Sequence, residues 1–123
     1  MKKLVYTLMF LFGFAAISFA QEATEIVMTE GAVELENSKK DGAYTFILNG
    51  KAEADINKSA NYYTNYFTLK FDESSQSVNL VMVDNTERSR AVIVRFLVSS
   101  GVRHANVDGK VISINDFMMN YLQ

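Results

Sequence analysis

The sequence contains no cysteine and no proline, and it has a single histidine among its 123 residues. Without cysteine, the chain has no disulfide, no thiolate metal ligand, no cysteine nucleophile and no cysteine that could carry a lipid. The domain must therefore fold on core packing alone. To act as a general base, the one histidine, His104, would need an orienting acid and a nucleophile beside it.

Strong charge of either sign is also lacking, since the formal net charge at pH 7 is −2. Nucleic acids and anionic membranes are bound through basic patches, so this mild acidity argues against both as partners. The carboxylates lie mostly in predicted turns and helix starts. No spaced pair of them stands within an apolar stretch, which argues against a two-carboxylate hydrolase. We therefore expect no catalytic residues, and we predict that the protein is not an enzyme.

Residues 1–20 have the layout of a secretory signal peptide. Lys2 and Lys3 precede an apolar run from Leu4 to Ile17, and small residues lead to a predicted cleavage between Ala20 and Gln21. An uncleaved membrane anchor is the alternative, but the run is short for a span of about 20 residues. We expect an exported protein of the periplasm or the extracellular medium, with no membrane attachment after cleavage.

Residues 21–42 are acidic and polar, and they predict an N-terminal extension. Its only expected element is a weak edge strand over Ala32–Leu35. A turn at residues 40–42 ends the extension, and the folded domain is predicted to cover residues 43–123.

Within that domain the apolar spacing alternates between period two and period 3.6. Residues 43–49 place Tyr44, Phe46 and Leu48 on one face of a strand. A later helix begins at capping residues 84–87 and ends before Gly101, with its arginines Arg88 and Arg95 outside the core stripe. The spacing predicts strands over residues 43–49, 67–72, 77–84 and 102–107, and helices over residues 55–66 and 84–100.

The C-terminal residues predict a short extension of this domain. Asp108 and Gly109 are a strong tight-turn signal, so residues 110–112 should return as a hairpin strand. Residues 115–122 then predict an amphipathic helix.

The element order from residue 43 is β-α-β-β-α-β. Right-handed crossovers convert this order into a ferredoxin-like α+β fold, a four-stranded antiparallel sheet with two helices on one face. The opposite face would be left bare. We expect the C-terminal helix to cover it, with a dimer partner or the N-terminal segment as alternatives.

Residues 43–107 resemble the heavy-metal-associated domain of copper chaperones and metal-pumping ATPases. The resemblance lies in element order and in VMVDNTERSRAVIVRFLVSSGV, residues 81–102, which is similar to the family's third strand and second helix. The resemblance implies a Cys-x-x-Cys metal site in the first strand-to-helix loop. The matching residues 49–54 contain no cysteine, histidine or methionine. The metal site is therefore not carried over, and we expect no cofactor.

Other candidate sites come from the residues themselves. Asn49 and Gly50 could present amides to an anion, but a plain turn is the favoured interpretation. Tyr62 and Tyr66 are one helical turn apart and, if exposed, have the composition of a contact surface for a protein or a glycan. A weaker candidate is a Cu(I) site built from His104 with two methionines; these methionines are Met118 and Met119.

These observations predict a non-enzymatic binding module whose partner is another envelope protein or a second copy of the chain. Tyr62 and Tyr66 are its expected contact residues. The alternative is a copper-handling protein that uses His104, Met118 and Met119. The sequence does not identify the ligand.

Overall fold

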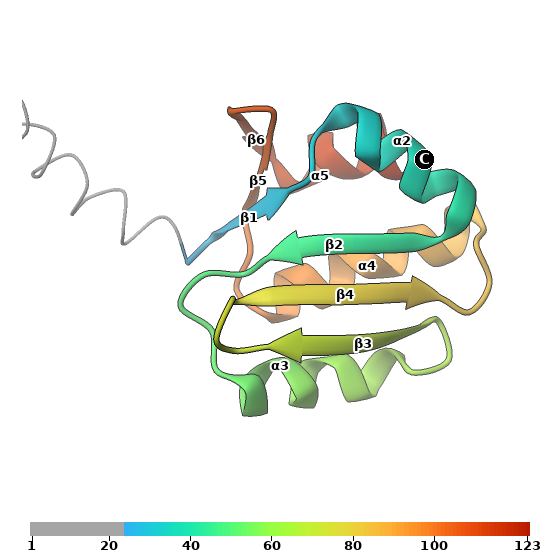
Figure 1. The fold of residues 1–123 in the computed structure, drawn as a ribbon. Helices are drawn as coiled ribbons and strands as arrows, with labels where there is room; N and C mark the ends of the chain where they lie inside the picture. The colour runs from blue at the N-terminus through green and yellow to red at the C-terminus, as the bar shows by residue number, and fades with distance from the viewer. Residues whose placement is uncertain (1–23) are drawn as a thin grey trace, which may run out of the picture.

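The computed structural model describes residues 24–123, which form one six-stranded sheet and four α-helices (Figure 1). The predicted signal peptide, residues 1–20, lies outside the described residues. No helix within the described range combines the length and the apolar composition that crossing a membrane requires.

The strands are β1 (Ile26–Thr29), β2 (Ala43–Ile47), β3 (Phe67–Asp72), β4 (Ser77–Met82), β5 (His104–Val107) and β6 (Lys110–Ser113). The helices are α2 (Ala32–Asp41), α3 (Glu53–Ala60), α4 (Glu87–Ser99) and α5 (Ile114–Phe117), with a 3-10 turn η1 (Asn61–Tyr63) and a π-helical turn η2 (Met118–Leu122).

The strand order is β3-β4-β2-β1-β5-β6, so the α+β class is confirmed, but the predicted four-stranded sheet is wrong. The N-terminal strand β1 inserts between β2 and β5, the first and last strands of the predicted four. It pairs parallel with β5 and antiparallel with β2. β6 adds the other new strand, at the sheet edge. Residues 26–29, which were predicted to belong to an extension outside the domain, thus form a strand near the middle of the sheet.

The edge strand predicted at Ala32–Leu35 is also wrong, because these residues open helix α2. No side chain of the helix itself caps its start. Instead the backbone N–H of Ala32 donates to the Asp108 carboxylate at 3.1 Å, from the turn between β5 and β6. The helix ends at Gly42, in the left-handed conformation that favours glycine. The start of α2 therefore depends on a side chain distant in sequence and its end on a left-handed glycine, and the local apolar pattern reveals neither.

The sheet has a narrow seam between β1 and β2. Only two residue pairs join these strands, Met28 with Ile47 and Thr29 with Phe46. On one side of the seam lie β3, β4 and β2, and on the other lie β1, β5 and β6. Helix α2 connects the two strands of the seam and buries Leu35 in the core beside them.

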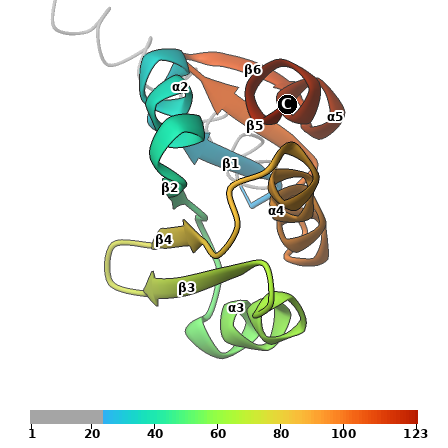
Figure 2. The ribbon, with the colours of Figure 1, turned by 90° about the vertical axis from the view of Figure 1, so that its right-hand side faces the viewer.

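One face of the sheet carries the core. Phe67 of β3 meets Phe96 of α4 edge to face at 5.8 Å, and Phe46 of β2 meets Phe117 of α5 at 6.3 Å. Helices α3, α4 and α5 lie on this side (Figure 2). The prediction that the C-terminal helix covers the opposite face is therefore wrong, because Phe117 belongs to the same buried cluster as Phe96.

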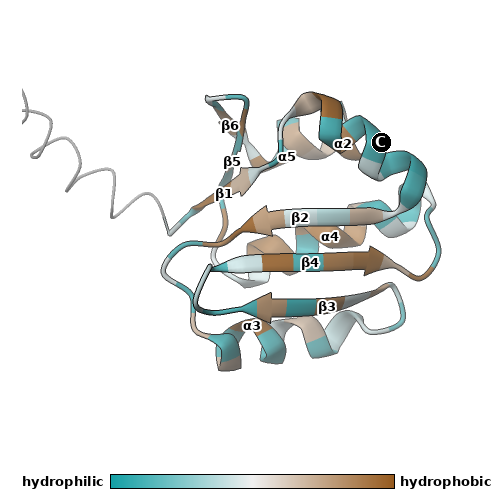
Figure 3. Cartoon of the chain, in the orientation of Figure 1, coloured by the Kyte–Doolittle hydropathy of each residue, from teal (hydrophilic) through white to brown (hydrophobic). Residues whose placement is uncertain are grey.

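No helix covers the middle of the other face among residues 24–123, and that face is partly polar. Hydropathy alternates along β3 and β4, with hydrophilic residues in the centre of each strand (Figure 3). The Thr45 hydroxyl donates to Asn79 Oδ1 at 3.2 Å across this face. Val81 is half exposed on the same face. The sequence overstated the apolar area of this face, because Thr45 and Asn79 interrupt it.

Several local predictions hold, with shifted limits. The turn at Asp108 and Gly109 is confirmed, with φ angles of 55° and 85°. Helix α4 is confirmed, and the Thr86 hydroxyl accepts the capping hydrogen bond from the N–H of Ser89. The first predicted helix, residues 55–66, instead begins at Glu53 and ends at Ala60. Asp55, the first residue of the predicted helix, lies within the first turn of α3.

Candidate functional site

The loop at residues 49–54 is tied to the rest of the fold by Gln76. The Lys51 N–H donates to Gln76 Oε1 at 2.9 Å, and Gln76 Nε2 donates to the Lys51 carbonyl at 3.1 Å. At the start of α3 the Glu53 N–H points to the Glu73 carboxylate at 3.4 Å. A protein carboxylate thus occupies the position where an external anion would bind at this helix start.

Lys51 also has a place inside the fold. Its Nζ lies 3.1 Å from the point where a Cβ on Gly101 would stand, just past the end of α4. The last turn of α4 contains no basic residue of its own. A cation at a helix C-terminus is stabilised by the helix dipole. Arg103 Nη1 supplies one by donating to the Val98 carbonyl at 3.2 Å, and Lys51 Nζ lies close by. The geometry of the loop agrees with a turn rather than a binding loop.

The weaker metal candidates face different directions. His104 is exposed on β5 and alternates with the buried Ala105, so it points to the open face of the sheet. Met118 packs against the core on the other side, beside the first turns of α4. Met119 is 60 % exposed. In residues 24–123 no group of three or more His, Asp or Glu side chains is placed to hold a metal ion.

The two candidate tyrosines are both exposed, Tyr62 by 76 % and Tyr66 by 40 %. Tyr63, between them, stacks on Phe67 with ring centroids 6.1 Å apart, which fixes η1 to the core. Both backbone polar groups of Tyr66, its N–H and its carbonyl, form hydrogen bonds. Its N–H donates to the Tyr63 carbonyl, and its carbonyl accepts from the N–H of Val83, both at 2.9 Å.

Tyr66 forms one wall of a groove along α4, with a volume of about 440 Å³. We call this the α4 groove; the residues that line it are Tyr66, Arg88, Ser89, Ala91, Val92 and Arg95. Tyr62 is not among them. The two tyrosines therefore do not share this groove. Tyr66 lies beside Arg88 and Arg95, for which the sequence predicted exposure but no part in a site.

The two arginines lie on one face of α4 because they are seven residues apart, about 10.5 Å along a helix axis. Ala91 and Val92 lie between them along the helix and add apolar surface to the lining of the groove. Neither guanidinium forms an ion pair. The one ion pair in residues 24–123 joins Lys39 Nζ to Glu36 Oε2 at 3.7 Å. The α4 groove thus presents two exposed cations, and none of the residues that line it is acidic.

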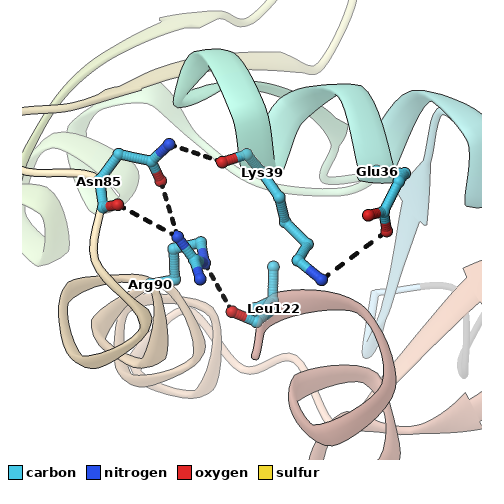
Figure 4. Close-up of polar contacts among 5 residues, drawn as sticks. All are labelled: Glu36, Lys39, Asn85, Arg90 and Leu122. Atoms are coloured by element: carbon cyan, nitrogen blue, oxygen red, sulfur yellow. Dashed lines mark hydrogen bonds and ion pairs between the residues drawn. The ribbon is translucent and has the colours of Figure 1, made fainter.

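A third arginine of α4, Arg90, points inward and was missed by the sequence analysis. Its Nε donates to the Leu122 carbonyl at 2.7 Å, and its Nη1 donates to Asn85 Oδ1 at 3.0 Å. Asn85 Nδ2 in turn donates to the Lys39 carbonyl at 2.6 Å, so the contacts join α2, α4 and η2 (Figure 4). The signal was available, because Arg90 precedes Ile93 and Leu97 at the spacing of the buried stripe.

Tyr44 lies near Arg90 with a buried hydroxyl that has no hydrogen-bond partner. The side chain is only 2 % exposed. Burial raises the pKa of Tyr44 from 10.0 to about 12, although the nearby Arg90 charge works in the opposite direction. The neutral phenol is therefore the form that the fold stabilises.

Tyr44 should make the protein sensitive to alkaline pH. Its pKa is raised in the folded state, so its contribution to stability is present below pH 10 and is lost as the pH rises through about 12. We expect Tyr44→Phe to flatten this loss. At pH 7 it should keep or raise the free energy of unfolding, by up to about 1 kcal/mol, because it removes an unpaired buried hydroxyl.

Urea unfolding followed by circular dichroism between pH 7 and pH 12 measures both effects. Tyr62→Phe is the matched control, since Tyr62 is exposed, and it should leave both unchanged. A loss of more than about 1 kcal/mol in Tyr44→Phe at pH 7 would contradict the interpretation, because it would show that the hydroxyl makes a stabilising hydrogen bond.

Comparison of the chain with protein-family models, with curated proteins and with solved structures finds no match in any of the three. The resemblance of residues 43–107 to the heavy-metal-associated domain thus stays a prediction from the sequence.

Proposed function

We propose that this protein is an exported, non-enzymatic binding module that holds an acidic segment of a protein partner in the α4 groove. The observation that carries this proposal is the pair of exposed guanidiniums of Arg88 and Arg95, which form no ion pair within residues 24–123 and lie on either side of Ala91 and Val92 in a groove that no acidic residue lines. Tyr66 is the contact residue retained from the sequence prediction, and Tyr62 is not required.

The chemistry of the groove favours carboxylates. A guanidinium binds a carboxylate through two parallel hydrogen bonds, which gives direction as well as attraction. Two such groups about 10.5 Å apart suit acidic residues two turns apart on a helix, or about three residues apart on an extended segment such as a short acidic peptide. Tyrosine and arginine are also enriched at protein interfaces, where they supply contact area and hydrogen bonds together.

The alternative function, copper handling through His104, Met118 and Met119, has no geometric support in the described residues. His104 points to the open sheet face and Met118 packs on the core side. A shared ion would need both side chains on one side of the sheet. We therefore do not develop this alternative.

The proposal is tested by titrating the ¹⁵N-labelled protein with an acetylated hexaglutamate peptide and recording amide chemical shifts. We expect shifts at Tyr66, Arg88 and Arg95. The double variant Arg88→Gln and Arg95→Gln should weaken binding about fivefold, because it removes two ion pairs that together contribute about 1 kcal/mol.

Lys58→Gln with Lys110→Gln is the control, since it removes the same charge from two exposed lysines outside the groove. It should bind like the parent protein. Absence of any shift at millimolar peptide would overturn the proposal. Equal weakening in the two double variants would do so too, because it would show attraction by overall charge alone.

A further inference from the structure

Helix α2 carries an acidic stripe that forms no ion pair with any basic side chain of residues 24–123. Glu34, Asn37 and Asp41 are exposed along one side of α2 and line a groove of about 290 Å³ beside the open sheet face. Glu34 and Asp41 form no ion pair within residues 24–123. We call Glu34, Asn37 and Asp41 the α2 stripe.

The α2 stripe and the α4 groove match in spacing and oppose in charge. Glu34 and Asp41 are seven residues apart on α2, as Arg88 and Arg95 are on α4, so each pair spans about 10.5 Å. Asn37 stands between the two acids, and in a parallel pairing of the helices it would face the small Ala91 between the two arginines. Two helices laid side by side would bring both carboxylates to both guanidiniums at once.

These surfaces cannot meet within one molecule. The α2 stripe shares its groove with Thr45, Asn79 and Val81 of the open sheet face, whereas α4 lies on the core side of the sheet. Figures 1 and 2 agree, with α2 and α4 on different sides of β2. Any contact between them joins different copies of the chain.

From this match we infer that the α4 groove receives the α2 stripe of a second copy. The inference rests on the proposed function, and it identifies the acidic segment that the α4 groove binds as the α2 stripe of another copy. Because two different surfaces meet, the contact is head to tail, and each copy can bind one neighbour through its groove and another through its stripe. Such a contact closes into a ring or extends into a filament, according to the rotation between neighbours.

The contact is small and carried by exposed ion pairs, so it should be weak and sensitive to salt. Sedimentation velocity across protein concentrations up to about 1 mM, in about 50 mM and about 500 mM NaCl, measures it. We expect the average mass to rise with concentration at low salt. At high salt the protein should remain monomeric over the same concentrations.

Charge reversal tests the two surfaces separately. One variant carries Arg88→Glu with Arg95→Glu, and the other carries Glu34→Lys with Asp41→Lys. Each alone should associate at least about tenfold more weakly than the parent protein, because like charges then face each other. An equimolar mixture should regain association, since each variant restores the missing opposite charge to the other. Circular dichroism melts confirm that both variants fold.

Two results would overturn the inference. One is a parent protein that stays monomeric at about 1 mM in low salt, and the other is association that survives either charge reversal. If the protein is monomeric but hexaglutamate still binds the α4 groove, the self-association fails while the proposed function stands. If neither occurs, both fail.

Discussion

Replacement of Phe117 by alanine is expected to lower the free energy of unfolding by about 3–5 kcal/mol, the usual loss for a fully buried aromatic side chain. Phe117 is completely buried in the core cluster, where its ring meets Phe46 edge to face. Deleting it leaves a cavity between α5 and β2. For a domain with about 5–15 kcal/mol of total stability, this is a large fraction. Urea unfolding followed by circular dichroism measures it.

Met119→Ala is the matched control, two residues away and mostly exposed, and it should change stability by no more than about 0.5 kcal/mol. A double-mutant cycle with Phe46→Leu and Phe117→Leu tests whether Phe117 of α5 lies against Phe46 of β2. We expect a coupling energy of about 0.5–1.5 kcal/mol, the range for an aromatic pair in contact. A coupling near zero would place α5 elsewhere, for example on the open sheet face as the sequence suggested.

The second large effect is expected for Val27→Asp in β1. Val27 is fully buried, with β2 and β5 on either side of its strand. An aspartate there would place a carboxylate in the core without a partner, and we expect it to cost more than about 4 kcal/mol and to abolish cooperative unfolding. Thermal unfolding followed by circular dichroism measures the change.

Val33→Asp is the matched control, because Val33 is 74 % exposed on α2. It should unfold within about 0.5 kcal/mol of the parent protein. The pair of variants shows whether residues 21–42 are an extension outside the domain or contribute a central strand to the sheet. If these residues formed an extension outside the domain, both substitutions would be equally mild, and that result would contradict the central position of β1.

The sequence predicted the elements whose apolar spacing is long and locally complete. Strands β2, β3 and β4 and helix α4 have enough alternating or helical positions to be recognised from their own residues. β1 has only four residues, and its burial comes from β5, with Ile26 paired to His104 far along the chain. Helix α2 was misread for a similar reason, since its first N–H is capped by Asp108 rather than by a neighbour in sequence.

The candidate site likewise has one feature that the sequence predicts and one that it does not. That Tyr66 is exposed was foreseeable, because it lies outside the apolar stripe of its segment. Its position beside Arg88 and Arg95 was not foreseeable, since it depends on how η1 and α4 pack on the sheet. The layer in which the C-terminal helix packs was also beyond the sequence, because an amphipathic pattern shows that a helix has a buried face without showing what that face meets.

The central place of β1 has a consequence for the order in which the molecule is assembled. Residues 43–82 supply β2, β3 and β4, whose ladders join residues at most 38 positions apart (Ala43 with Val81), against 78 for Ile26 and His104 of β1 and β5. β1 is made before them, yet its longer ladder is with β5, and closing so long a loop costs entropy that local pairings avoid. The earliest strand of the fold thus gains its second partner only when residues 104–107 have emerged, and the sheet is completed from the end of the chain rather than from its beginning.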